Sequence, residues 1–406
     1  MLFTPQKLGN IELKNRSIRS AAFENMGKNY SPTEELLNYH KSVALGGVAM
    51  TTIAYASVNR SGVSFDGQLW LRPEILPELK RMADEIHACG SKVAIQIGHC
   101  GNMTHYYTAG QMPVGASSGF NLYSPTLVRG LKEKEIYELV EDFGKSIDLV
   151  KEAGFDAVEI HAGHGYLISQ FLSPYTNKRS DKFGGSLENR MRFMTLVIEE
   201  VMKRANKEIA VVVKTNMYDG FKSGMQRAEC LQVAKKLESL GVDGLVLTAG
   251  FVSKAPMTVM HGAMPIKTLA YYMDMKKFWW LKVCIRLFGR FMMPSQPFSE
   301  GYFLEDAKVF RKELKLPIIY VGGLISREKI EEVLACGFEF VQMARVLINN
   351  PNFINDCEKS DLTYRSNCGH SNYCIGRMYS VPFKCHHCAE NLPKKIVKEI
   401  EKAEKK

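Results

Sequence analysis

Amphipathic segments alternate with short apolar ones along most of the chain. At five places a segment with helix-like spacing of apolar residues ends at a glycine, and a short apolar run follows within a few positions. Glycine suits the left-handed position that ends a helix before a tight turn into a strand. We therefore expect a helix-to-strand connection in each of residues 44–52, 88–96, 152–160, 239–247 and 335–343.

Three further runs, at residues 17–23, 209–215 and 317–323, have the same short and β-branched character and bring the number of expected strands to eight. Such runs between helices are typical of buried parallel strands. Eight alternating units predict a (β/α)8 barrel of the TIM type. A doubly wound sheet is the competing architecture, but no Gly-x-Gly-x-x-Gly stands between a first strand and a helix, as its dinucleotide site would require.

The expected barrel takes up residues 1–355 and carries one long insertion, residues 251–303, after the sixth strand. An ordinary strand-to-helix connection is far shorter, and the next clear helix is expected only near Leu304. The insertion is rich in methionine, and its residues 276–290 interleave basic with large apolar side chains. Three interpretations stay open: a lid over a bulky apolar substrate, a subunit contact or a membrane-surface helix. A lid or subunit contact is favoured, since the insertion lies on the catalytic face.

Composition and charge narrow the class of protein. The length of 406 residues, with 46% hydrophobic and 24% charged residues, fits a globular barrel with an insertion. No apolar run is long enough for a membrane span, and the first residues lack the pattern of a secretory signal, so we expect a cytoplasmic protein. The formal charge of +10 comes with no nucleic-acid motif. We expect no nucleic-acid partner, only attraction of phosphorylated cofactors.

The candidate chemistry lies directly after the strand within residues 152–160, where His161, His164 and Tyr166 follow one another closely. Ligands bind at the carboxyl ends of the strands in parallel α/β folds. Any one of these rings could serve packing alone. Three of them at one strand end, followed by a glycine-rich and charged loop, indicate a functional site.

The run from His161 to Pro174, continued by Asn177, Arg179, Asp181 and residues 184–190, resembles the signature of the Old Yellow Enzyme family of FMN-dependent ene-reductases. The differences are Ala-Gly between the two histidines and Phe183 where tyrosine is usual. Neither position touches the expected chemistry. The resemblance covers most of residues 2–345, apart from the insertion.

The resemblance implies an NAD(P)H-dependent flavin oxidoreductase. Hydride would pass from NADH or NADPH through flavin N5 to the β-carbon of an α,β-unsaturated carbonyl compound. His161 and His164 would bind the carbonyl oxygen, and Tyr166 would protonate the α-carbon from the opposite face. The methionines and tryptophans of the insertion suggest a bulky apolar substrate. The alternatives are an NADH oxidase or demethylase-like activity, or a non-catalytic barrel used as an interaction protein.

The same resemblance assigns residues to the cofactor FMN. Small side chains would lie against the flavin, Gln96 would offer a donor and an acceptor to its pyrimidine edge, and Lys214, where relatives have arginine, would face N1 and O2. The family's Ala-Gly-Arg after His99 is Cys100-Gly-Asn102 here, so no role is assigned to that arginine. The small residues are Ala21, Ala22 and Ala54.

The ends of the last two strands are the expected phosphate site. Backbone N–H groups and a short helix commonly bind phosphate there in barrels, and glycine lets the backbone approach closely. Arginine adds charge and a fork of donors. The residues match the Gly-Gly and Gly-Arg motifs of the family, with alanine in place of the last glycine: Gly322, Gly323, Ala344 and Arg345.

Residues 356–406 are expected to form a cysteine-containing extension with a charged helical tail. Relatives of the 2,4-dienoyl-CoA reductase type carry an iron–sulfur cluster in this region and continue into a second nucleotide-binding region, which we do not expect here. Arg377 and Val381 replace two ligands of their motif, so we expect no four-thiolate cluster. Reduced thiols are the favoured state, and no metal is assigned. Zinc is the alternative, with His370, His386 or His387 as substitute ligands for Cys368, Cys374, Cys385 and Cys388.

Overall fold

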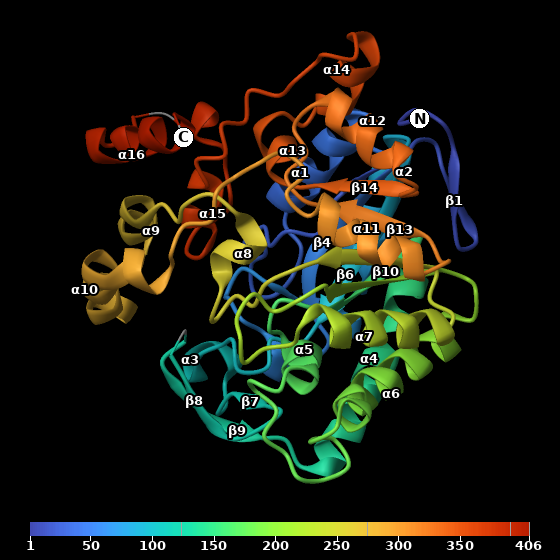
Figure 1. Cartoon of the computed structure of the whole chain (residues 1–406), viewed down its shortest axis with the longest axis vertical. Helices are drawn as coiled ribbons and strands as arrows, with labels where there is room; N and C mark the ends of the chain where they lie inside the picture. The colour runs from blue at the N-terminus through green and yellow to red at the C-terminus, as the bar shows by residue number, and fades with distance from the viewer. Residues whose placement is uncertain (123, 274, 390, 406) are drawn as a thin grey trace.

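The computed structural model describes residues 1–122, 124–273, 275–389 and 391–405, without the side chains of 275–278, 280 and 281. Within these ranges, eight parallel strands close into a barrel with helices around it (Figure 1). Closure is made by β14, which pairs with β3, and by β3, which pairs with β4. The strands are β3 (Ser17–Arg19), β4 (Met50–Ser57), β6 (Lys92–Gly98), β10 (Ala157–Ala162), β11 (Ala210–Asn216), β12 (Gly244–Thr248), β13 (Ile318–Val321) and β14 (Phe340–Met343).

The predicted (β/α)8 barrel is thus confirmed, and each of the eight predicted segments overlaps one barrel strand. The helix-ending glycines behave as the sequence predicts. Gly47, Gly90, Gly154, Gly241 and Gly337 all have φ between +75° and +100°, which favours glycine over any residue with a Cβ atom.

The outer layer is made by the helices that link successive barrel strands and by α13, which follows the last strand, with their apolar faces on the barrel. They are α1 (Glu34–Leu45), α2 (Leu76–Ala88), α4 (Glu133–Glu152), α6 (Leu187–Ala205), α7 (Arg227–Ser239), α11 (Leu304–Glu313), α12 (Arg327–Ala335) and α13 (Arg345–Asn349).

The two ends of the barrel are covered differently. The hairpin of β1 (Gln6–Leu8) and β2 (Ile11–Leu13) closes the amino end, where its apolar side chains join the barrel interior in one buried cluster. Short elements surround the opposite end (Figure 1). They are β5 (Leu69–Trp70), α3 (Tyr106–Ala109), the small sheet of β7 (Val114–Gly115), β8 (Gly119–Asn121) and β9 (Thr126–Gly130), and α5 (Leu167–Leu172).

Residues 251–303 hold α8 (Pro256–Met260), α9 (Ile266–Tyr272) and α10 (Met275–Met292). Met257 and Met264 pack with Ile266, Leu269, Ile285 and Ile375 in a small core, so these methionines serve the insertion's own packing. The side chain of Met275 and those of residues 276–278 lie outside the described residues. No helix in the described part is both long and apolar enough to cross a bilayer.

The carboxyl-terminal residues form α14 (Phe353–Lys359), α15 (Tyr373–Met378) and α16 (Lys394–Glu404). Helix α14 packs on the barrel, whereas α15 and α16 contact α9 of the insertion. Glu399 of α16 accepts hydrogen bonds from the backbone N–H groups of Lys267 and Thr268, each at 2.9 Å. Helix α16 is packed on the protein, because Ile396 and Ile400 on it are buried.

Candidate active site

The three predicted catalytic rings converge at the carboxyl end of β10. His161 lies on the strand, and His164 occupies the following turn with φ of +59°. Tyr166 caps the amino end of α5. The ring centre of His161 lies 5.2 Å from that of His164 and 4.6 Å from that of Tyr166.

His164 is held by residues of the next two strands, β11 and β12. Its Nε2 lies 2.9 Å from Oγ1 of Thr248 at the end of β12, and its backbone N–H donates to Oδ1 of Asn216 on β11 at 3.1 Å. A positive φ is uncommon for a residue with a side chain. These two contacts therefore fix a turn that aims the imidazole at the barrel mouth.

Both imidazoles are neutral at physiological pH. Burial, and to a lesser extent the nearby charge of Lys214, lower the pKa of His164 to about 3. Burial, His164 and Lys214 together lower the pKa of His161. Nδ1 of His161 accepts from the backbone N–H of Gly163 at 3.4 Å, which leaves Nε2 to carry the proton. Neutral rings of this kind can donate a hydrogen bond to a substrate oxygen.

The phenol of Tyr166 keeps its proton. Burial is the largest cause that raises its pKa above the usual value. Its ring packs against Tyr55 with centroids 5.1 Å apart, and Oη of Tyr55 lies 2.7 Å from Oγ of Ser64. A buried, protonated phenol next to two neutral imidazoles is suited to donate a proton.

Below these rings, inside the barrel, lies a buried polar cluster around Glu159. Its Oε1 lies 2.8 Å from Nζ of Lys214 and accepts from Nε2 of Gln96 at 2.6 Å. Its Oε2 accepts from Nε2 of Gln342 at 2.7 Å. The structure thus brings together Gln96 and Lys214, the two residues that the sequence suggests for the flavin pyrimidine edge.

Sequence reasoning missed Glu159 and Gln342. A signal for Glu159 existed, because a carboxylate interrupts an apolar strand two positions before His161 and therefore faces the same side. Gln342 stands in the same way in the apolar strand β14. His99, in contrast, is engaged elsewhere, since its ring nitrogens contact Oγ of Ser61 at 3.0 Å and the N–H of Gly101 at 2.9 Å.

The three alanines lie at the first two strands. Ala21 and Ala22 follow β3 and are partly exposed, whereas Ala54 is buried within β4. The N–H of Ala54 donates to the carboxylate of Glu24, which forms a buried ion pair with Arg19 at 2.6 Å. This ion pair fixes the backbone that carries the small side chains.

Two of the predicted phosphate-binding residues, Gly323 and Arg345, contact the same side chain, that of Tyr302. Gly323 has φ of +67°, and a Cβ atom there would come within 2.6 Å of the Tyr302 ring. Arg345 lies on α13, directly after Ala344, and donates to Oη of Tyr302 at 3.4 Å and to Oδ1 of Asn372 at 2.7 Å. The loop after β13, which begins with Gly322, and the start of α13 therefore face the same region.

The five cysteines of the carboxyl-terminal extension, Cys357, Cys368, Cys374, Cys385 and Cys388, are free thiols. Burial raises the pKa of Cys374 to about 12, so its thiol keeps its proton. The ligand atoms of Cys385, His386 and His387 lie within 4.8 Å of one another. Among the described residues, Cys385, His386 and His387 are therefore the possible zinc ligands that lie close together.

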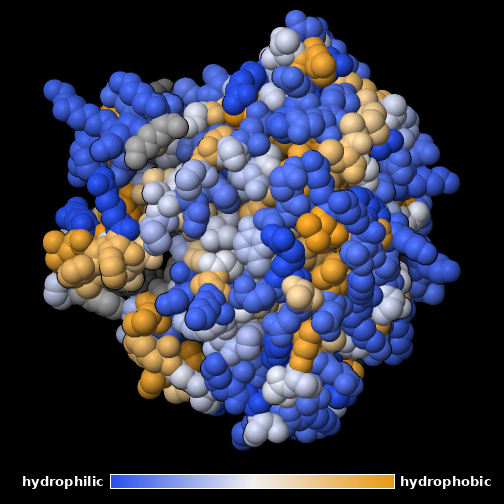
Figure 2. Space-filling view, in the orientation of Figure 1, coloured by the Kyte–Doolittle hydropathy of each residue, from blue (hydrophilic) through white to orange (hydrophobic). Residues whose placement is uncertain are grey.

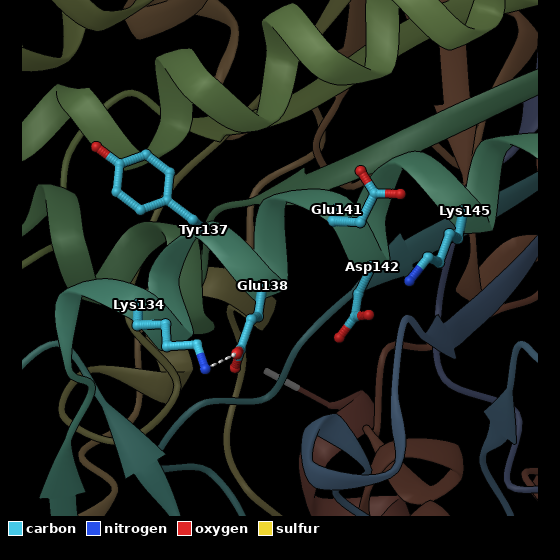
Figure 3. Close-up of a pocket in the computed structure, with 6 residues that line it drawn as sticks. All are labelled: Lys134, Tyr137, Glu138, Glu141, Asp142 and Lys145. Carbon is cyan, nitrogen blue, oxygen red and sulfur yellow. Dashed lines mark ion pairs between the residues drawn. The ribbon is translucent and has the colours of Figure 1, made fainter.

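A surface hollow along α4 is separate from this site (Figure 3). Nζ of Lys134 and Oε1 of Glu138 pair across it at 3.6 Å, and both side chains are exposed. None of the three rings contributes to its lining, which consists of Lys134, Tyr137, Glu138, Glu141, Asp142 and Lys145.

Residues 1–283 match the family model of the NADH:flavin oxidoreductase / NADH oxidase family. The chain belongs to this family. Membership confirms the resemblance seen in the sequence, and it implies FMN and NAD(P)H. The protein is therefore an oxidoreductase of the NADH:flavin oxidoreductase class.

Two curated relatives align with this chain over nearly their whole length. A 4,4'-dithiodibutanoate disulfide reductase of Rhodococcus erythropolis is 35% identical over 380 residues, 93% of each chain. An NADPH dehydrogenase of Listeria monocytogenes is 34% identical over 368 residues, 88% of this chain and 94% of the relative. An NADH oxidase of Thermoanaerobacter brockii is 29% identical over 355 residues, 86% of this chain, and only 49% of that protein is covered.

Solved structures share the fold. A 2-naphthoyl-CoA reductase complex superposes with a TM-score of 0.80 at 24% identity, over 98% of this chain and 58% of the other. An Old Yellow Enzyme homologue from Zymomonas mobilis gives 0.70 at 22% identity, over 93% and 99% of the two chains.

Proposed function

We propose that this protein uses NADH or NADPH to reduce the activated C=C bond of an α,β-unsaturated carbonyl compound, with FMN as the bound cofactor. The observation that supports the reaction most is the convergence of two neutral imidazoles and one protonated phenol at the carboxyl end of β10. These groups match the two demands of the reaction, which are polarisation of a carbonyl oxygen and donation of a proton to carbon.

The residues present fit FMN. Gly323 has a positive φ at the end of β13, and Arg345 supplies a cation at the neighbouring strand end, so both suit a phosphate. Lys214 and Gln96 would hold the pyrimidine edge, with Ala21, Ala22 and Ala54 against the ring system. When bound in its reduced form, FMN supplies the hydride.

The protein's own side chains polarise the substrate and donate the proton. The N–H groups of His161 and His164 donate to the substrate carbonyl oxygen and stabilise the negative charge that develops there, as an oxyanion hole does. Tyr166 delivers its proton to the α-carbon. Thr248 and Asn216 keep His164 in place, so the site is formed before the substrate arrives.

A second candidate is reduction of a disulfide, because the Rhodococcus relative named for that reaction is 35% identical over 93% of both chains. A panel assay separates the two. Purified protein is given NADH or NADPH without oxygen, together with an unsaturated ketone, acid or thioester, or with 4,4'-dithiodibutanoate. Turnover of an unsaturated carbonyl compound supports the proposal, and turnover of the disulfide alone contradicts it.

Two further outcomes point to the remaining alternatives. Oxidation of NAD(P)H that requires oxygen and no other acceptor would indicate an oxidase. A colourless protein whose thermal stability does not rise with added FMN would indicate a non-catalytic barrel, because a ligand that binds only the folded state must stabilise it.

The pH dependence offers one prediction. Because burial holds the pKa of His164 near 3 and also lowers that of His161, neither ring takes up a proton between roughly pH 5 and pH 8. We expect kcat/KM for the unsaturated substrate to show no imidazole inflection in this range. An inflection near the usual histidine pKa that disappears in His164→Asn would contradict this assignment.

The lowered pKa values of His161 and His164 also make the free energy of unfolding depend on pH. In the unfolded chain these histidines take up protons once the pH falls below about 6.5, whereas the folded state does so only at much lower pH. Their contribution to stability is therefore complete above this pH and declines as the pH falls from about 6.5 towards 3. Urea unfolding of wild type and His164→Asn at several pH values measures the decline.

Arg345→Met is expected to weaken FMN binding by about tenfold to a hundredfold, the usual worth of a charge-assisted hydrogen bond. Quenching of flavin fluorescence on titration of flavin-free protein measures the affinity. Asn372→Ala is the control, since it removes the partner of Arg345 at 2.7 Å and keeps the guanidinium. Equal affinities of wild type and Arg345→Met would show that phosphate binds elsewhere.

A further inference from the structure

Helix α10 presents a stripe of large apolar side chains to solvent. Trp279, Val283, Leu287 and Phe291 follow one another at intervals of four residues and therefore share one face. Their exposed fractions are 62%, 46%, 70% and 88%. Figure 2 shows the hydrophobic surface that results at the left edge of the molecule.

The opposite face of α10 is the one packed on the protein. Ile285 is buried in the core of the insertion, and a Cβ atom on Gly289 would come within 2.8 Å of Ile266 on α9. The helix is thus anchored with its apolar stripe outward. Apolar patches of this kind mark sites for a partner protein or a membrane.

The charges on α10 are all positive. Residues 275–292 contain no aspartate or glutamate and include Lys276, Lys277, Lys282, Arg286 and Arg290. Arg286 and Arg290 are exposed, and neither pairs with a carboxylate of the described residues. The positive charges of Arg286 and of Lys395 on α16 add to burial in lowering the pKa of Lys282. A positive field therefore borders the apolar stripe.

A second group of exposed apolar side chains lies on α3 and on the β8–β9 hairpin. Tyr107, Phe120, Leu122 and Leu127 are each more than half exposed. In Figure 2 this region lies just below α10, along the same edge. Both regions belong to connections that leave the carboxyl ends of barrel strands, β6 and β12, so they lie on the side of the candidate active site.

We propose that α10 docks this protein on an anionic lipid surface. A helix with tryptophan, phenylalanine and leucine on one face and arginine beside them fits the boundary between headgroups and acyl chains. Its basic residues complement anionic headgroups. This docking does not depend on which acceptor the enzyme reduces.

A second copy of the chain fits this surface less well. Two α10 helices packed on each other would bring their arginines together with no carboxylate on either helix, and like charges across an interface weaken it. A lid, which the sequence favours together with a subunit contact, also fits less well, because the stripe is open to solvent and Met257 and Met264 are buried in the small core with Ile285.

The test is co-sedimentation of the flavin-loaded full-length protein with vesicles. We expect binding to vesicles of equal parts phosphatidylcholine and phosphatidylglycerol, and much weaker binding to phosphatidylcholine alone. Leu287→Ser/Phe291→Ser should lower the affinity by more than about tenfold, since each side chain loses its apolar burial. Arg286→Gln/Arg290→Gln should lower it by about fivefold per arginine.

Leu45→Ser/Leu362→Ser is the matched control, because these leucines are 64% and 51% exposed and lie outside α10. It should bind vesicles like the wild type. Reduction of a small soluble acceptor should be unchanged in the α10 variants, which shows that they fold. Failure to bind the mixed vesicles, or binding that the α10 substitutions leave unchanged, overturns the proposal. The proposal is also overturned if the wild type does not bind vesicles but forms a dimer, and if Leu287→Ser/Phe291→Ser is a monomer. In that case a second copy of the chain covers the stripe.

Discussion

Tyr166→Phe is expected to lower the reduction of an unsaturated carbonyl substrate by about a hundredfold to ten-thousandfold, the usual worth of a positioned proton donor. Reduction of the enzyme by NAD(P)H should keep its rate, because that step needs no proton from the phenol. Stopped-flow measurements under anaerobic conditions separate the two half-reactions. Phenylalanine keeps the ring contacts with Tyr55 and His161, so the loss is one of chemistry and not of packing.

Tyr55→Phe is the matched control for this substitution. Its ring lies in the same aromatic cluster, and its hydroxyl contacts Oγ of Ser64 at 2.7 Å and is hydrogen-bonded to the Tyr166 phenol, but it is not the assigned proton donor. Loss of each of these neutral hydrogen bonds should cost no more than about tenfold. Tyr166 would lose its assigned role if both half-reactions slowed equally, or if the two phenylalanine variants behaved alike.

Local sequence patterns predict the barrel well, because the helix-ending glycines and the apolar runs depend only on near neighbours in the chain. The rings of His161, His164 and Tyr166 are predictable for the same reason, since one strand end carries all three. Glu159 was missed because its importance depends on three other strands. Gln96 on β6, Lys214 on β11 and Gln342 on β14 meet it only once the strands are aligned in register.

The packing of the carboxyl-terminal extension likewise cannot be predicted from local sequence patterns. Its cysteine spacing suggests metal chemistry, but the sequence gives no sign of where the segment packs. In the structure Phe383 packs with its ring centre 4.7 Å from that of Tyr39, and Asn372 binds Arg345. Burial raises the pKa of the Tyr166 phenol, and the nearby Tyr379 adds to this rise. These contacts join residues far apart in the chain, so no local pattern predicts them.

Lys214→Met is expected to destabilise the flavin-free protein by about 3–5 kcal/mol, the usual cost of leaving one partner of a buried ion pair alone. The carboxylate of Glu159 would remain in the barrel interior with only the amides of Gln96 and Gln342. Glu159→Gln should cost a similar amount, because the next contact of Lys214 Nζ is Oγ of Ser20 at 3.5 Å. Urea unfolding without FMN measures these costs apart from any effect on cofactor affinity.

The double variant Glu159→Gln/Lys214→Met distinguishes charge pairing from packing. It removes both charges, so no buried ion is left unpaired, and its cost should be close to that of one single variant and well below their sum. Lys235→Met is the surface comparison. Its 2.7 Å pair with Glu313 is half exposed on both sides, so solvent screens it and its loss should cost far less than either buried substitution. If the loss of unfolding free energy in the double variant equalled the sum of the two single losses, Glu159 and Lys214 would stabilise the barrel independently. The proposed role of Glu159 in holding the cation of Lys214 would then be wrong.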